Sequence, residues 1–165
     1  MGKSQTNRAA AAAARELAAT VTSWATSAPP VGTARYGSLY GLLLDVGESF
    51  TPAPRPADVV AGAMGFCYAN AVTAASLPGW AYVEGLALLD TGGTRLPVPH
   101  AWVTTDGHTA VDVTWPDGKG VAYLGVRLAP AAWAGRPFWD SSPVLDVHAR
   151  PTLLTHGVPG DWLMP

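Results

Sequence analysis

The sequence contains a single cysteine, Cys67, among its 165 residues. This excludes a disulfide within the chain, and it also excludes a zinc site built from several cysteine thiolates. Because the fold does not depend on oxidation, we expect the protein to work in a reducing compartment, the cytoplasm.

Charged residues are also scarce, since they make up only 13% of the chain. The net charge of -2 and the isoelectric point near 6.0 argue against a nucleic-acid partner, which requires a basic surface. They also argue against a polybasic membrane patch. No apolar run approaches the roughly 18 residues of a membrane-spanning helix, and residues 1–19 lack the apolar segment of a secretory signal. We therefore expect neither nucleic acid nor a membrane as a partner.

The first segment with a clear pattern is residues 8–25, which are rich in alanine, the best helix former. Leu17, Val21 and Trp24 recur at i, i+4 and i+7, as on one face of a helix. The sequence therefore predicts an amphipathic helix that ends before Pro29.

Three shorter segments follow. Residues 36–46 fit a short helix or a strand equally well. The proline-rich stretch 51–58 predicts a loop, because proline fits neither the middle of a helix nor a central strand. Residues 66–76 predict a helix that opens after Gly65.

The pattern then changes to strands. Aromatic and apolar residues predict strands over 80–90 and 121–128, and residues 91–99 predict a turn-rich connection. Residues 100–116 predict a hairpin with Asp106-Gly107 at its tip.

Helices first and strands later predict an α+β fold, with N-terminal helices packed on an antiparallel sheet. We expect one domain over 1–165. Within it we distinguish an Ala-rich helical part (1–30), a core (58–128) and a loop-rich tail (129–165).

The hairpin brings two titratable residues together in one register. A three-residue loop with Gly107 in the left-handed conformation places His100 directly opposite Asp112. A two-residue Asp-Gly loop turns Asp112 to the other face instead.

A cysteine at the head of a helix becomes a good nucleophile when such a pair is near. The helix N-terminus favours an anion, an imidazolium stabilises a thiolate, and a carboxylate orients the imidazole. Cys67, His100 and Asp112 are thus the parts of an acyl-transfer site. The backbone N–H of Cys67 is one candidate donor to an oxyanion.

The order GFCYANA, YVEG, PHAWV and VDVTWP, within residues 62–126, resembles the transglutaminase-like branch of the papain-like fold. The resemblance implies that Cys67, His100 and Asp112 act as nucleophile, base and orienting acid. Val113 departs from the proline that often follows the aspartate in that family. This departure leaves the triad intact and the substrate class open.

Two further residues are candidates for substrate binding. Glu84 lies in an otherwise apolar strand and needs a hydrogen-bonding partner, so a structural role is its main interpretation. In the predicted register Trp102 shares the face of His100 and can wall the pocket, whereas Trp115 falls on the opposite face.

Metal and phosphate sites are not indicated. His108, His148 and His156 are far apart, and no phosphate-binding glycine-rich motif is present. We therefore expect no metal and no cofactor.

The leading hypothesis is a thiol peptidase, amidase or amide acyltransferase that acts on a peptide, protein or small amide. An arylamine N-acetyltransferase uses the same residue types on an acyl-CoA, but this chain is short for that activity. The alternatives are a catalytically silent binding or inhibitor module, whose partner is a protein, and a purely structural component. Seven tryptophans suit an interface. Reactivity of the thiol separates an enzyme from a silent module.

Overall fold

The computed structural model describes residues 3–137 and 139–165 and shows an α+β fold, which confirms the predicted class. The described strands form a closed barrel in the order β1-β4-β3-β2-β5. They are β1 (Glu48–Ala53), β2 (Ala81–Asp90), β3 (Arg95–Thr104), β4 (Thr109–Val111) and β5 (Gly120–Leu128). The helices are α1 (Lys3–Ser27), α2 (Leu39–Val46), α3 (Cys67–Ala75), α4 (Pro130–Trp133), α5 (Thr152–His156) and the 3-10 turn η1 (Gly160–Trp162).

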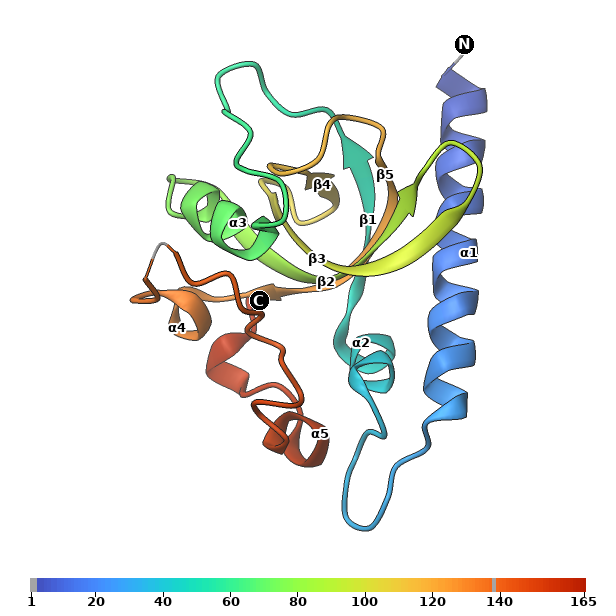
Figure 1. Cartoon of the computed structure of the whole chain (residues 1–165), viewed down its shortest axis with the longest axis vertical. Coiled ribbons are helices and arrows are strands. Elements are labelled where there is room, and N and C mark those ends of the chain that lie inside the picture. Colours follow the sequence, from blue (N-terminus) through green and yellow to red (C-terminus); the bar gives the residue numbers. More distant parts are fainter. Residues whose placement is uncertain (1–2, 138) are drawn as a thin grey trace.

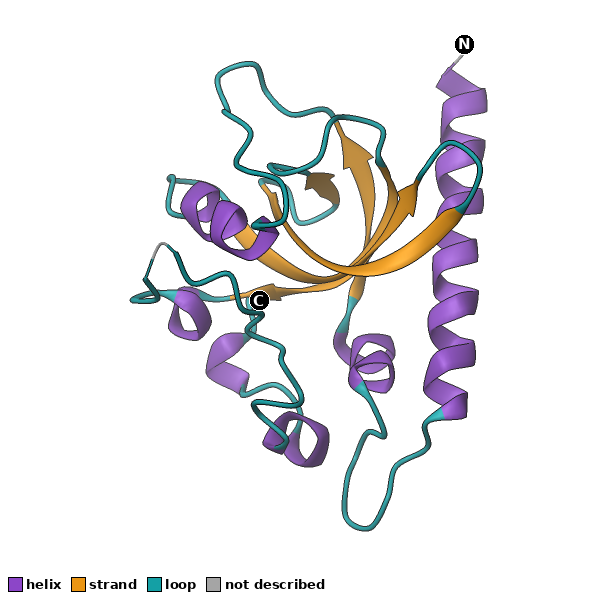
Figure 2. Ribbon diagram, in the orientation of Figure 1, coloured by secondary structure: helices purple, strands orange, loops and turns teal. Residues whose placement is uncertain are grey.

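The helices surround the barrel on several sides. Figure 1 shows α1 and α3 on opposite sides of the strands, and Figure 2 shows the strands at the centre of the helices and loops. The predicted first helix is confirmed, because Leu17 and Val21 of α1 are buried and Trp24 packs on Tyr40 of α2 with ring centroids 4.9 Å apart. The ambiguous segment 36–46 contains a helix, α2, whose start is capped by the Ser38 side chain.

The sheet is mixed rather than wholly antiparallel, because β1 pairs with β4 in parallel. The prediction of a loop over 51–58 is wrong at its start, where Pro52 lies inside β1. In the described pairings β1 contacts β5 only through residues 48–50 and β4 through residues 51–53. The N–H of Thr51 donates to the His108 carbonyl at 3.0 Å. The nitrogen of Pro52 therefore points to the side that carries no ladder bond, and the missing donor costs little.

The predicted connection 91–99 is also wrong in its second half, because β3 begins at Arg95. β2 and β3 pair without interruption from Asp90 and Arg95 to Ala81 and Thr104. The turn between them is tight, since the N–H of Thr91 donates to the carbonyl of Thr94 at 3.0 Å. Pro97 and Pro99 lie in the less buried half of β3, where the described ladder shows no pairing with β4, since β4 pairs with β3 only at Val103.

Two apolar clusters hold the fold together. A small one fills the barrel interior and includes Phe50, Val83, Trp102 and Tyr123. The larger one lies between the outer face of the strands and the helices, where α3 packs on β2 and β3.

Among the described residues, no helix has both the length and the apolar character needed to cross a membrane.

Candidate active site

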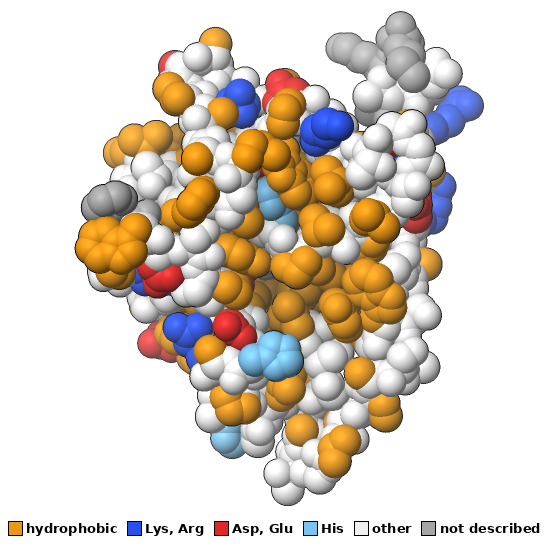
Figure 3. All heavy atoms as spheres, viewed as in Figure 1, with side chains coloured by type: hydrophobic (Ala, Val, Ile, Leu, Met, Phe, Trp, Pro, Cys, Tyr) orange, Lys and Arg blue, Asp and Glu red, His pale blue; other side chains and the backbone are white. Residues whose placement is uncertain are grey.

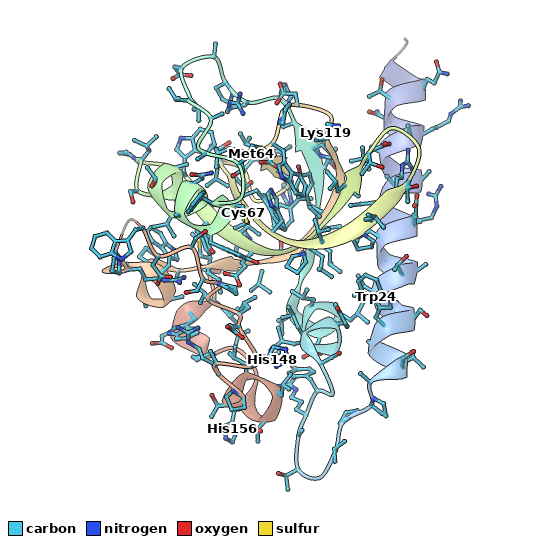
Figure 4. The ribbon with its side chains drawn as sticks, viewed as in Figure 1. Trp24, Met64, Cys67, Lys119, His148 and His156 are labelled. Atoms are coloured by element: carbon cyan, nitrogen blue, oxygen red, sulfur yellow. The ribbon has the colours of Figure 1, made fainter. Side chains whose placement is uncertain are left out.

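Cys67 is the first residue of α3, as the sequence predicts. Gly65 makes the turn into the helix with φ of 85°, a left-handed conformation that suits glycine. Phe66 occupies the N-cap, and its hydrocarbon side chain cannot satisfy the free N–H groups of the first turn. Cys67 is partly exposed and lies at the end of α3 that faces the barrel (Figure 4). The first turn of α3 therefore offers backbone donors next to an accessible thiol.

His100 lies on β3 and is only 1% exposed. Its Nε2 is 2.8 Å from Oδ2 of Asp112, and Trp115 stacks on the imidazole with ring centroids 3.7 Å apart. Burial lowers the pKa of His100, but hydrogen bonds to Asp112 and Cys67 outweigh burial and raise this pKa from 6.5 to about 8. With Nε2 bonded to Asp112, Nδ1 is the ring nitrogen left for other partners. Imidazolium is thus the main form of His100 at neutral pH.

Asp112 uses both carboxylate oxygens. Oδ1 accepts the backbone N–H groups of Thr114 and Trp115, each at 2.8 Å. Oδ2 contacts His100 and accepts the hydroxyl of Tyr123 at 2.9 Å. Burial acts to raise the pKa of Asp112, but these hydrogen bonds and the charge of His100 lower it overall. The residue is therefore an ionised carboxylate that both shapes a turn and orients the imidazole.

The pair forms in a register that differs from the predicted one. Val103 pairs with Val111, so the β3–β4 register is shifted by two residues and His100 is not directly opposite Asp112. The Asp106 side chain accepts the N–H groups of His108 and Thr109 and so draws the hairpin turn together. A shift of two residues preserves the alternation of faces, so Asp112 still points toward His100.

The predicted face of Trp115 is wrong for a related reason. β4 ends at Val111, and the chain turns at once around Oδ1 of Asp112. Strand alternation no longer applies there, so Trp115 reaches the imidazole. Trp115 is partly exposed, whereas His100 is enclosed.

Trp102 lies in the buried interior of the barrel and does not face a pocket. It is 0% exposed inside the barrel, where it packs on Phe50 and Tyr123 with ring centroids 5.6 and 4.9 Å away. A side chain buried in this way cannot wall a pocket, so that expectation is wrong; the tryptophan next to His100 is Trp115, which stacks on the imidazole.

Glu84 has the structural hydrogen bonds that its sequence context required. It accepts the Tyr82 hydroxyl at 2.8 Å and the backbone N–H groups of Val144 and Leu145 at 2.8 and 2.7 Å. Burial raises its pKa, although these hydrogen bonds oppose the shift. Glu84 thus anchors the tail to β2, and it does not contact the reacting atoms.

Sequence reasoning missed two residues that support the site, Tyr123 and Asn70. Tyr123 donates to Asp112, and Asn70 donates from α3 to the Ala63 carbonyl and to the Thr114 hydroxyl, each at 2.9 Å. The bonds from Asn70 fix the helix of the nucleophile to the turn of the acid. Alternation along residues 121–128 points Tyr123 into the barrel, which was a usable signal, whereas nothing local in the sequence links Asn70 with Thr114.

No group of three histidine, cysteine, aspartate or glutamate side chains gathers as a metal site within the described residues. A scan of the chain against protein-family models gave no match, and searches of curated proteins and of solved structures gave none either.

Proposed function

We propose that the protein is a cysteine-dependent acyl-transfer enzyme, with Cys67 as nucleophile, His100 as acid and base, and Asp112 as orienting acid. The hydrogen bond between His100 and Asp112, together with the interaction of His100 with Cys67 at the start of α3, carries this proposal. The resemblance to transglutaminase-like proteins supports the same roles. A papain-like core would accommodate these three residues.

The first half-reaction forms a thioester. Cys67 reacts as the thiolate, with its proton already on the His100 imidazolium, and the sulfur attacks the carbonyl carbon of an amide. The carbonyl π electrons move to the oxygen, where the free N–H groups at the start of α3 can stabilise the negative charge. The intermediate collapses as His100 returns the proton to the departing amine.

The second half-reaction releases the acyl group. Water or an amine gives a proton to His100 and attacks the thioester, and the Cys67 thiolate leaves. Asp112 keeps the imidazole oriented through both steps, because its own position is fixed by Thr114, Trp115 and Tyr123. Hydrolysis and amine transfer share all of these steps.

The direct test is the rate at which iodoacetamide alkylates Cys67 between pH 4 and pH 10. Since this is the only cysteine, the mass of the intact protein reports it alone. We expect fast alkylation near neutrality in the wild type and loss of the low-pH reactivity in His100→Ala. His156→Ala is the matched control, because His156 is exposed on α5, away from Cys67 in Figure 4.

An unreactive thiol, or a titration that His100→Ala leaves unchanged, contradicts the proposal. That result favours the silent binding module instead. If the thiol is activated as expected, mass spectrometry of covalent adducts after incubation with amide and ester substrates identifies the acyl group directly.

A further inference from the structure

A cavity of about 380 Å³ lies beside the proposed active site, between α2, α3, the β2–β3 hairpin and the tail. Its size is within the range of about 300 to 1,000 Å³ that is typical of small-ligand pockets. Figure 3 shows hydrophobic side chains around a hollow in the middle of this face. In Figure 4, Cys67 lies on one side of this region and His148 on the other.

The cavity begins at the neighbours of the catalytic candidates. Tyr68 follows Cys67, Pro99 precedes His100, and Gly85 is the β2 partner of His100; all three line it. Burial raises the pKa of Tyr68, and the charges of Glu84 and Cys67 add to the shift. The phenol is therefore neutral and close to the thiol. An acyl group attached to the sulfur of Cys67 has this cavity next to it.

The far walls of the cavity are largely apolar, with Leu39 from α2 and Leu145, Val147 and Leu154 from the tail. The acidic side chains in the lining are engaged elsewhere. Both oxygens of Glu84 accept hydrogen bonds from Tyr82 and the tail backbone. Asp146 caps the backbone N–H groups of His148 and Ala149. The surface left for a ligand is thus largely hydrophobic, with Tyr40, Tyr68 and His148 as its main polar side chains.

We propose that this cavity holds an apolar side chain on the acyl side of the substrate, either aromatic or branched aliphatic. The inference rests on the proposed function, because it needs Cys67 as the attacking group. It narrows the substrate class to amides whose acyl part carries a bulky hydrophobic substituent. Tyr68 and Leu39 are then specificity-determining residues, and Glu84 is a positioning residue that holds the tail wall in place.

The test compares two chloromethyl ketones that alkylate Cys67, N-acetyl-phenylalanyl and N-acetyl-glycyl chloromethyl ketone. Each rate is divided by the iodoacetamide rate of the same variant, so that changes in thiol reactivity cancel. We expect the phenylalanyl reagent to react at least about tenfold faster in the wild type, since a filled hydrophobic pocket discriminates by this order.

Leu39→Trp fills the cavity and should bring the ratio of the two rates close to one. Leu44→Trp is the matched control on the same helix, because Leu44 is 41% exposed and does not line the cavity. It should keep the wild-type ratio. If Leu39→Trp fails to fold, Val147→Phe makes the same test from the tail.

The outcomes separate the two proposals. A wild-type ratio near one, with a thiol that iodoacetamide alkylates rapidly, overturns the pocket and leaves the proposed function standing. If the thiol is inert, the proposed function fails. The pocket is then tested by itself, by titrating N-acetyl-phenylalanine amide into the protein and following the NMR spectrum. Absence of shifts at Tyr68 and Leu154 in that titration overturns the pocket as well, whereas saturable shifts there support it as an apolar binding site.

Discussion

Replacing Asp112 with asparagine is an informative test of the site, because the two carboxylate oxygens of Asp112 accept hydrogen bonds from different donors. Oδ1 accepts the N–H groups of Thr114 and Trp115, whereas Oδ2 serves His100 and Tyr123. An asparagine has one acceptor oxygen, so its NH₂ group must face one of these sets of donors. We therefore expect Asp112→Asn to remove the negative charge and also to weaken the turn.

The size of the effect follows from the pKa of His100, which the site raises from 6.5 to about 8. Since one pKa unit corresponds to about 1.4 kcal/mol, the site favours the imidazolium by about 2 kcal/mol. At pH 7 about nine-tenths of His100 is then protonated in the wild type. Without the charge of Asp112, the pKa of His100 should fall toward 6.5, where about a quarter of the imidazole is protonated at pH 7.

Two measurements check this expectation. NMR titration of the His100 ring should show the fall in pKa, and the alkylation rate of Cys67 at pH 7 should fall with it. Denaturant unfolding should show a loss of about 1 to 3 kcal/mol from the unsatisfied donors. Asp106→Asn is the matched control, because Asp106 also accepts two backbone N–H groups in a turn but is exposed and forms no bond to His100.

The reasoning is refuted if the pKa of His100 stays near 8 in Asp112→Asn, or if Asp106→Asn lowers the alkylation rate equally. The first result would mean that the carboxylate does not hold the proton on the imidazole. The second would mean that the loss comes from general loosening of the hairpin.

Three further predictions concern the same barrel. Tyr123→Phe removes a hydrogen bond to the Asp112 carboxylate, so the unfolding free energy should fall by about 1 kcal/mol and the pKa of His100 should rise, which denaturant titration and NMR can measure. Gly85→Ala should unfold in far less denaturant, because a Cβ there would lie 2.1 Å from the Leu124 carbonyl oxygen, whereas Gly93→Ala, with open space around it, should match the wild type. The stability due to the His100–Asp112 pair should be complete between about pH 4 and 6.5. It should be lost above pH 8 as His100 deprotonates, and at acid pH as Asp112 is protonated; melting curves of wild type and His100→Ala across pH would show this as a shrinking difference.

Local patterns in the sequence were enough to predict several parts of the fold. Alanine content and spacing predicted α1, and Gly65 before an apolar run predicted α3 with Cys67 at its start. Asp106-Gly107 predicted the hairpin turn, where Gly107 has φ of 75°. These features depend on residues close together in the chain, so their signals are present in the sequence itself.

The remaining parts depend on contacts that are remote in the chain. Pro52 is acceptable in β1 only because the strand changes partners next to it. The stacking of Trp115 on His100 follows from the early end of β4, which the hydrogen bonds of Asp112 enforce. Glu84 is satisfied by backbone groups about sixty residues later. Neither secondary-structure propensity nor the alternation of side chains along a strand predicts contacts between residues so far apart in the chain.

The parallel pairing of β1 with β4 should affect when, during folding, the Cys67 thiol becomes reactive. β4 lies between β1 and β3, and the turn that carries Asp112 follows it directly. Contacts between residues so distant in sequence form slowly, since the chain must first lose the entropy of closing a long loop. We therefore expect the thiol of a nascent or refolding chain to stay unactivated until the barrel closes. The growing chain would then be protected from its own nucleophile until folding is complete.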